Sequence, residues 1–334
     1  MSAGEAEFVQ GCDPTGHAPD LAISAAPLVQ AQTYSCFDFR LASQLPLPDL
    51  APVADDDMRP LVEVKLADLP ERLDGAGPPQ ANLQVAGEDA LLEVPGVGRF
   101  LMRDGRQILV DPTPGVSERR LRLFLLGSAL GILAHQRGLV PLHANAVIAD
   151  GGAYAFCGPS GAGKSTLAAH LQQSGYELLC DDVCPVALDD RNRPLAWPGV
   201  PRLKLWADAA WALGHDPAAL EGVAEGVEKY HLSVARPDRP RPMPLRSLYV
   251  LDRASDASAD AITRLTGQEA MQAVLANTYR GMYLASMGLS ARHFRQCAAM
   301  LDSLRVYRAP RVWGLDVFAR EAGKLERHMT GNGE

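Results

Sequence analysis

Hydrophobic and polar residues alternate with a period of two in the first third of the chain. The pattern runs through FDFRL at 37–41 and VEVKL at 62–66, and it predicts strands whose alternate side chains face a core. The stretch RFLMRDGRQILV at 99–110 predicts a hairpin, because Asp104-Gly105 supplies the positive φ angles of a two-residue turn. Residues 1–30 are rich in Ala, Gly and Pro and have no periodicity. We therefore expect a flexible tail at 1–30 and a small β-rich domain at 31–115.

The remaining two thirds of the chain predict alternating helices and strands. Ser117 can cap a long helix that Gly138 ends. Two short strands follow within 145–158, joined by Gly151-Gly152, and SLYVLD at 247–252 predicts a further strand. This alternation is typical of α/β proteins, so we expect a second, α/β domain at 116–334.

Composition and charge narrow the class of protein. A chain of 334 residues with 47% hydrophobic residues can bury a sizeable core. The formal charge of −8 argues against nucleic acid as a partner, since proteins that bind it carry a basic face. Six cysteines are too few for a disulfide scaffold, the N-terminus lacks the basic start of a signal peptide, and the longest apolar stretch, at 123–134, is too short to span a membrane. We expect a cytoplasmic protein without a membrane partner.

The strongest motif is GPSGAGKST at 158–166, which satisfies G-x-x-x-x-G-K-[ST]. An apolar strand precedes it and a helix-like segment follows, as a phosphate-binding P-loop requires. Glycines let backbone N–H groups surround phosphate oxygens, the lysine reaches the β- and γ-phosphates, and the serine hydroxyl binds Mg²⁺. We therefore predict ATP and Mg²⁺ as cofactors, bound by Gly158, Pro159, Ser160, Gly161, Ala162, Gly163, Lys164, Ser165 and Thr166.

Two adjacent aspartates end the next apolar segment, GYELLCDDVCPV at 175–186. Asp181 and Asp182 follow Lys164 by 17 and 18 residues, as one strand after the P-loop helix would place them. Phosphoryl transfer needs Mg²⁺ near the γ-phosphate and a group that orients and deprotonates the acceptor. Neighbouring strand residues face opposite sides, so the two carboxylates can divide these roles. The spacing alone does not assign them, and it leaves His143 in PLHANAV as a further candidate.

The stretch LHANAVIADGGAYAFCGPSGAGKSTLAAHLQQSGYELLCDDV resembles the catalytic core of HPr kinase/phosphorylase, a bacterial serine kinase. A histidine, a two-strand hairpin, the P-loop and an Asp-Asp pair occur in the family's order. The resemblance implies a P-loop core related to phosphoenolpyruvate carboxykinase, with a mixed, curved sheet. It implies that Asp181 is the general base toward a serine hydroxyl, that Asp182 and Ser165 hold the metal, and that His143 assists at the phosphate.

The resemblance is close only over 140–190. Where HPr kinases carry a Glu-Ile-Arg-Gly signature, this chain has AWPGVPRLKLW, and its β-rich start differs from their N-terminal domain. The whole chain is more similar to the HPr-kinase-like kinases of lasso-peptide biosynthesis, which implies a precursor peptide whose C-terminal serine is phosphorylated. We expect a peptide or small-protein substrate with an acceptor serine, and a homo-oligomer is compatible with the sequence.

Phosphoryl transfer also needs cations around the transferred group. The candidates are Arg202, Lys204, Lys229, Arg236 and Arg239. The segment NTYRGMY at 277–283 is assigned to packing. A transporter-type ATPase is excluded by the lack of an LSGGQ-like signature. Three alternatives stay open: an HPr kinase proper, a kinase for a small-molecule alcohol, and a nucleotide-gated binding module without catalysis.

Overall fold

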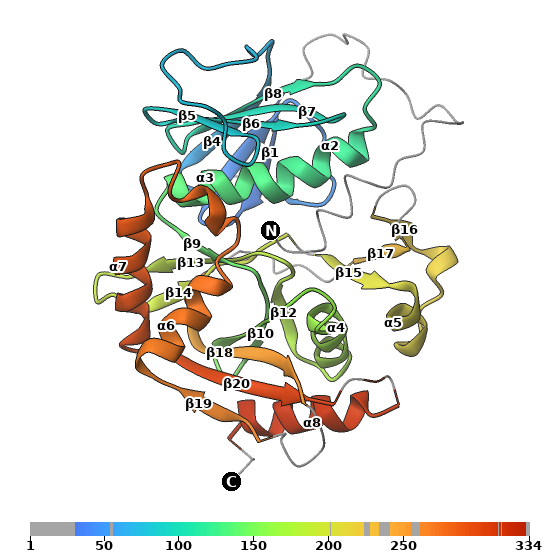
Figure 1. Ribbon diagram of the computed structural model, residues 1–334. Helices are drawn as coiled ribbons and strands as arrows, with labels where there is room; N and C mark the ends of the chain where they lie inside the picture. The colour runs from blue at the N-terminus through green and yellow to red at the C-terminus, as the bar shows by residue number, and fades with distance from the viewer. Residues whose placement is uncertain are drawn as a thin grey trace.

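The computed structural model describes residues 31–53, 56–200, 202–223, 228–233, 241–254, 261–312, 314 and 316–331. The tail expected at 1–30 lies outside these residues. The described strands form three sheets (Figure 1).

The first sheet confirms that the N-terminal region is rich in β structure. It has eight strands in the order β3-β1-β2-β4-β8-β7-β6-β5. Their bounds are β1 (Gln32–Cys36), β2 (Phe39–Ser43), β3 (Ala51–Pro52), β4 (Leu61–Leu66), β5 (Leu83–Ala86), β6 (Asp89–Val94), β7 (Gly98–Arg103) and β8 (Gln107–Pro112).

The alternation at 37–41 is not one strand, because the chain turns back within it. Cys36 pairs with Phe39, and Phe37 has a φ of 49°. Phe37 and Phe39 are nonetheless both buried, in edge-to-face contact at 5.8 Å. A hairpin turn can therefore preserve an alternating pattern when its first residue packs into the core.

The hairpin predicted at 99–110 is confirmed, with a longer loop. Asp104 and Gly105 have the expected positive φ angles, 48° and 59°. Arg103 pairs with Gln107, so the loop has one residue more than the two-residue turn that the sequence predicts.

The helix predicted between Ser117 and Gly138 is present and packs on the first sheet. Ser117 accepts a hydrogen bond from the backbone N–H of Arg120 at 3.3 Å, and Gly138 ends the segment with a φ of 83°. The segment consists of α2 (Glu118–Phe124), a π-helical turn η1 (Leu125–Ala129) and α3 (Leu130–Gln136). Its buried leucines share one hydrophobic cluster with the strands above it (Figure 1). The domain boundary predicted at 115/116 thus falls between this helix and the sheet on which it packs.

The second sheet is mixed and is built around the long strand β18 (Met243–Arg253). β18 runs parallel to β11 and β20 and antiparallel to β14. It extends the strand predicted at 247–252. The remaining strands are β9 (Val140–Leu142), β10 (Ala144–Ala149), β11 (Gly152–Cys157), β12 (Glu177–Cys180), β13 (Cys184–Leu188), β14 (Pro194–Ala196), β19 (Thr263–Leu265) and β20 (Arg305–Arg311).

The hairpin of β10 and β11 turns one residue earlier than predicted. Ala149 pairs with Gly152, and the two turn residues are Asp150 and Gly151, with φ angles of 46° and 68°. Asp-Gly is a favoured pair for such a turn, so Gly152 is free to begin the second strand.

Helices and a third, small sheet surround the second sheet (Figure 1). The third sheet has the order β15-β17-β16. The elements are α4 (Lys164–Gln173), α5 (Ala207–Ala212), η2 (Pro217–Ala219), α6 (Gly267–Ala276), η3 (Gly281–Tyr283), α7 (Ser290–Leu301), α8 (Phe318–Met329), β15 (Arg202–Trp206), β16 (Glu221–Gly222) and β17 (Lys229–Ser233). The predicted mixed α/β architecture is therefore present.

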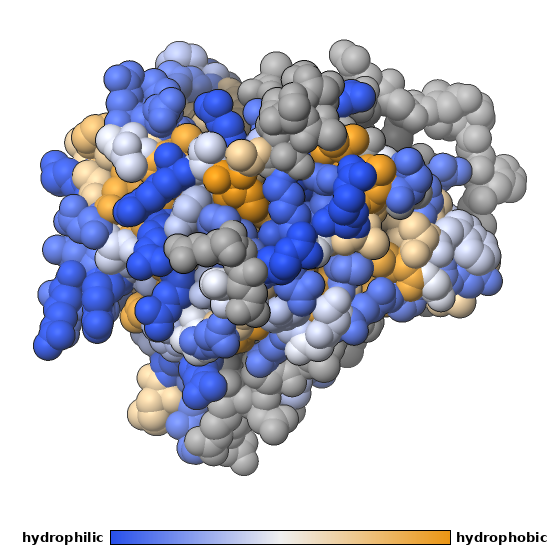
Figure 2. Space-filling model, turned by 90° about the horizontal axis from the view of Figure 1, so that it is seen from below, coloured by the Kyte–Doolittle hydropathy of each residue, from blue (hydrophilic) through white to orange (hydrophobic). Residues whose placement is uncertain are grey.

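The surface opposite the first sheet is largely hydrophilic, with small and separate hydrophobic areas (Figure 2). Within the described part of the chain, none of the helices combines the length and the apolar character needed to cross a membrane.

The packing of α3 on the first sheet predicts a large effect of shortening Leu130, which is fully buried in the shared cluster. Leu130→Ala should lower the free energy of unfolding by about 2–5 kcal/mol, because it leaves a cavity. The matched control is Leu66→Ala at a side chain that is 40% exposed, where we expect about 0.5 kcal/mol or less. Chemical denaturation measures both, and equal losses would contradict this packing.

Candidate active site

The G-x-x-x-x-G-K-S motif lies between the end of β11 and the start of α4. Gly158 has a φ of 139°, and a Cβ there would lie 2.5 Å from the carbonyl oxygen of Leu251 in β18. Only glycine fits this close approach of two backbones. Lys164, the first residue of α4, is buried and donates hydrogen bonds to the carbonyls of Gly158 at 2.9 Å and Pro159 at 3.3 Å. The loop therefore curls around the lysine ammonium.

Two side chains from distant parts of the chain hold this loop. The Asn277 Oδ1 accepts the backbone N–H of Gly158 at 3.1 Å. The Arg311 guanidinium, buried at the end of β20, donates to the carbonyl of Ala162. Burial lowers the pKa of Arg311 to about 10, with Glu321 acting in the opposite direction, so the group remains charged at neutral pH.

The two aspartates follow β12 instead of ending it, since the strand stops at Cys180. The N–H of Val183 donates to the carbonyl of Asp181 at 2.8 Å, across Asp182, whose φ is 69°. A hydrogen bond over three residues with a positive central φ is the pattern of a rare, strained γ-turn. The expectation that the carboxylates diverge by strand alternation is therefore wrong: this turn sets their directions.

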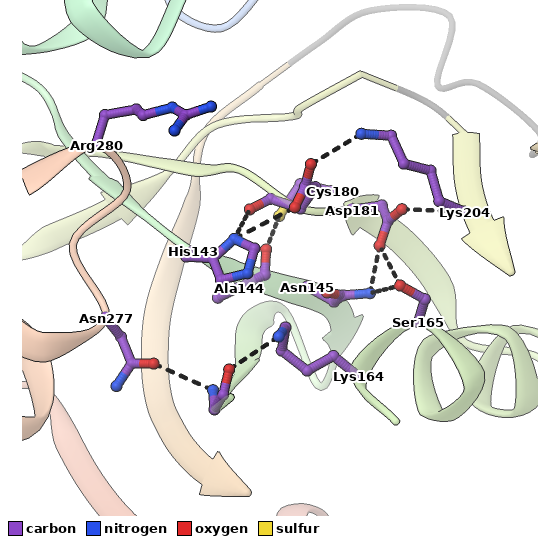
Figure 3. A network of polar contacts seen from close by, with 12 residues as sticks. His143, Ala144, Asn145, Lys164, Ser165, Cys180, Asp181, Lys204, Asn277 and Arg280 are labelled. Carbon is purple, nitrogen blue, oxygen red and sulfur yellow. Dashed lines mark hydrogen bonds and ion pairs between the residues drawn. The ribbon is translucent and has the colours of Figure 1, made fainter. Parts of the chain in front are cut away.

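Asp181 is enclosed by donors from three elements (Figure 3). Its Oδ1 accepts hydrogen bonds from the Ser165 hydroxyl at 3.0 Å and from the Asn145 side-chain amide at 2.5 Å, and its Oδ2 accepts the backbone N–H of Lys204 at 2.9 Å. Burial and the charge of Asp182 raise the pKa of Asp181 to about 6. The carboxylate beside Ser165 is thus Asp181, whereas the sequence pairs Ser165 with Asp182.

Asp182 faces two other side chains. Its Oδ2 accepts from the Lys204 ammonium at 2.9 Å, and its Oδ1 lies 3.3 Å from the His143 Nδ1. Burial raises the pKa of Asp182, but the charge of Lys204 and its hydrogen bond to the carboxylate outweigh it and hold the pKa well below its ordinary value. The Asp182 side chain is 31% exposed, whereas Asp181 is only 5% exposed. Asp182 is therefore the carboxylate that an incoming group can touch.

His143 positions Asp182 through one ring nitrogen. The His143 Nδ1 also lies 3.1 Å from the carbonyl oxygen of Asp182. Because both neighbours are acceptors, Nδ1 carries the proton and Nε2 has the free lone pair in the neutral ring. Burial lowers the pKa of His143 despite the attraction of Asp182, which favours that neutral form. The ring of Tyr279 stacks on the imidazole at 5.8 Å.

The predicted cations reach different places. Arg202 and Lys204 line one cleft with the two aspartates, as their shared face of β15 predicts, and Arg202 is ion-paired with Asp49 of the first sheet's β2–β3 connection. Lys229 lies over the ring of Trp206 at 4.7 Å. Arg236 and Arg239 fall outside the described residues.

Several residues that build this site lie outside the set that the sequence predicts. The segment 277–283 is predicted to serve packing, yet the Asn277 side chain contacts the P-loop and its backbone carbonyl accepts the backbone N–H of His143 at 2.7 Å. Its approach depends on a pairing with the end of β9 that no local pattern reveals. Asn145 and Arg311 each carry a signal in the sequence. Asn145 is a polar residue within an apolar strand, and Arg311 is a charged residue at the end of an apolar strand.

The comparisons with known proteins give little further information. No protein-family model matches the chain, and no curated protein matches it in sequence. Among solved structures, the chain is similar to the HPr(Ser) kinase/phosphatase from Coxiella burnetii, with 14% identity and a TM-score of 0.29, over 58% of this chain and 99% of that chain. A likeness this distant carries no argument about activity, so the function has to be inferred from the site itself.

The ion pair between Lys204 and Asp182 predicts how the carboxyl group titrates. Replacing the ammonium in Lys204→Met should raise the pKa of Asp182, because its largest source of electrostatic stabilisation is gone. Carbon-13 NMR of the aspartate carboxyl groups measures this, with Asp182→Asn identifying the resonance. Lys65→Met, at an exposed ion pair with Glu63, is the matched control. An unchanged Asp182 midpoint in Lys204→Met would contradict the assignment.

Proposed function

We propose that the protein is a kinase that transfers the γ-phosphate of ATP, with Mg²⁺, to a serine hydroxyl of a peptide or small protein. One observation carries the proposal: Ser165 of the G-x-x-x-x-G-K-S motif donates a hydrogen bond to Asp181, and the adjacent carboxylate, Asp182, is held in a different position by Lys204. A module that only binds nucleotide has no use for the second carboxylate, which is oriented by His143 and Lys204 and accessible from a cleft.

The phosphates of ATP would bind at residues 158–166. The backbone N–H groups of the loop and the start of α4 favour anions. Lys164 would exchange its hydrogen bonds to loop carbonyls for contacts with the β- and γ-phosphates, which compensates its burial. Arg311 and Asn277 keep the loop in shape from outside.

Ser165 and Asp181 fit Mg²⁺. Two oxygens in neighbouring positions of an octahedron, each about 2.1 Å from Mg²⁺, lie about 3.0 Å apart. The Ser165 Oγ and the Asp181 Oδ1 lie 3.0 Å apart. Among the described residues, no group of three or more His, Cys, Asp or Glu side chains could hold a metal, and Mg²⁺ is commonly held by one or two protein oxygens with phosphates and water. When bound there, Mg²⁺ would neutralise charge on the β- and γ-phosphates.

Asp182 would then take the role toward the acceptor that the resemblance to HPr kinases assigns to Asp181. Its carboxylate is the more exposed of the two, and Lys204 and His143 fix its orientation. The transition state of phosphoryl transfer is loose, so orienting the hydroxyl contributes more than a strong base does. Asp182 would accept a hydrogen bond from the serine hydroxyl and receive its proton as the new P–O bond forms.

The finer proposal concerns the acceptor, which we infer to be the C-terminal serine of a lasso-type precursor peptide. This part rests on the sequence resemblance over 140–190 and on the β-rich start, and on no contact in the structure. HPr and small-molecule alcohols are the competing acceptors.

Transfer of label tests the function directly. Purified protein, with Mg²⁺ and γ-labelled ATP, should transfer the label to peptides that end in serine. The acceptors compared with these peptides are HPr, peptides that end in serine amide, and glycerol. Lys164→Ala should weaken ATP binding about tenfold or more, because charged hydrogen bonds to the phosphates are lost. Lys65→Ala, at an exposed lysine, is the matched control. Label on HPr or on glycerol alone would show that the acceptor is not a serine-ending peptide. ATP binding without label on any acceptor would refute the kinase function.

The two aspartates make separable predictions. Asp182→Asn should reduce kcat by about 100-fold or more at an unchanged Mg²⁺ requirement. Asp181→Asn should instead raise the Mg²⁺ concentration needed for half-maximal rate. Asp302→Asn, at an exposed position after α7, is the control. Titration of the rate against Mg²⁺ concentration distinguishes the two roles. A changed Mg²⁺ requirement in Asp182→Asn alone would show that Asp182 holds the metal, as the sequence resemblance implies.

A further inference from the structure

The cleft beside the aspartates has a wall that comes from the helix packed on the first sheet. Leu123 of α2 and Leu126 and Gly127 of η1 line it, together with Asp181 and Asp182. Among the described residues that line this cleft, none belongs to the P-loop. The cleft and the P-loop therefore approach the aspartate turn from separate elements. In-line phosphoryl transfer requires this separation, since the attacking oxygen enters away from the leaving oxygen.

The helix is irregular where it meets the cleft. Leu125–Ala129 forms a π-helical turn between α2 and α3. Such turns are rare in proteins, and many of those that occur lie at functional sites. Arg280 donates to the Ser128 hydroxyl at 2.6 Å and so holds the turn in place. A Cβ on Gly127 would lie 3.3 Å from the Tyr279 hydroxyl, so glycine allows Tyr279 to pack closely against this turn.

The cleft has further apolar lining, and one of its charged lining residues is ion-paired with the first sheet's β2–β3 connection. Val183 and Val200 line the cleft beside the aspartates, and Val183 belongs to the same hydrophobic cluster as the helix. Arg202, whose side chain is only 14% exposed, is ion-paired with Asp49, which ties β15 to the first sheet. The apolar lining thus lies directly beside the carboxylate that would receive the acceptor proton.

We propose that this cleft is the acceptor subsite, and that it takes a serine peptide whose residue next to the serine is apolar. The apolar neighbour packs against Leu123, Leu126 and Val200 while the hydroxyl reaches Asp182. The first sheet therefore takes part in substrate selection through its helix. This inference rests on the proposed kinase function.

Leu123 offers the sharpest test, because it is half-buried, lines the cleft and carries no polar group of its own. Leu123→Glu should raise the KM for a serine peptide with a leucine neighbour about tenfold or more, the scale of a lost apolar contact. It should lower the KM for the peptide with a lysine neighbour, by charge attraction. The dissociation constant of ATP should not change. Leu123→Met should behave as the wild type, and Leu66→Glu is the matched control on an exposed leucine.

Gly127→Ala gives a second and independent reading. The added methyl group meets the Tyr279 hydroxyl and so shifts the turn that lines the cleft, and the KM for the peptide should rise while ATP affinity stays constant. If the wild type labels peptides but neither variant changes the KM or the neighbour preference, the cleft is not the acceptor subsite and the kinase function stands. If the wild type labels HPr or glycerol but no peptide, the peptide subsite fails and the kinase function stands; if it labels no acceptor at all, both proposals fail.

Discussion

Two adjacent carboxylates in one partly buried turn repel each other, and the rest of the site is arranged around that repulsion. The free energies of ionisation of the two carboxylates therefore have to be set by different contacts. Lys204 serves both: its backbone N–H binds Asp181 and its ammonium binds Asp182. The result is one carboxylate enclosed by neutral donors with a raised pKa and one that stays ionised beside a cation. Lys204, one residue of β15, therefore contributes to the different pKa values of two adjacent aspartates.

The position of Lys204 depends in turn on the first sheet. Lys204 lies on β15, two residues from Arg202, and Arg202 is ion-paired with Asp49. Arg122 of α2 approaches the same aspartate at 3.8 Å. The β-rich region thus contacts the site through an ion-paired cluster and through the helix whose π-helical turn lines the cleft. Arg202 therefore links the strand that carries the partner of Asp182 to the first sheet.

The sequence predicts those features that depend on neighbouring residues. The P-loop between a strand and a helix, the Ser117 cap and the Asp104-Gly105 turn all follow from short patterns. Short sequence patterns do not predict the features that depend on distant contacts. Phe37 satisfies the alternating pattern from within a turn, and the positive φ of Asp182 redirects both carboxylates. Asn277 reaches the P-loop because of a pairing across more than a hundred residues, which hydrophobic periodicity does not encode.

The contacts from outside the loop at 158–166 also fix the direction of its peptide groups. In a trans peptide the C=O and the N–H point in opposite directions. Arg311 binds the carbonyl of Ala162, so the N–H of Gly163 in the same peptide unit points away from that guanidinium. Asn277 engages the N–H of Gly158 at the other end of the loop. The loop is therefore oriented from outside by β20 and by the connection after α6. Donors that are oriented before the ligand arrives need no reorganisation as charge develops, and such preorganisation is the main source of electrostatic catalysis.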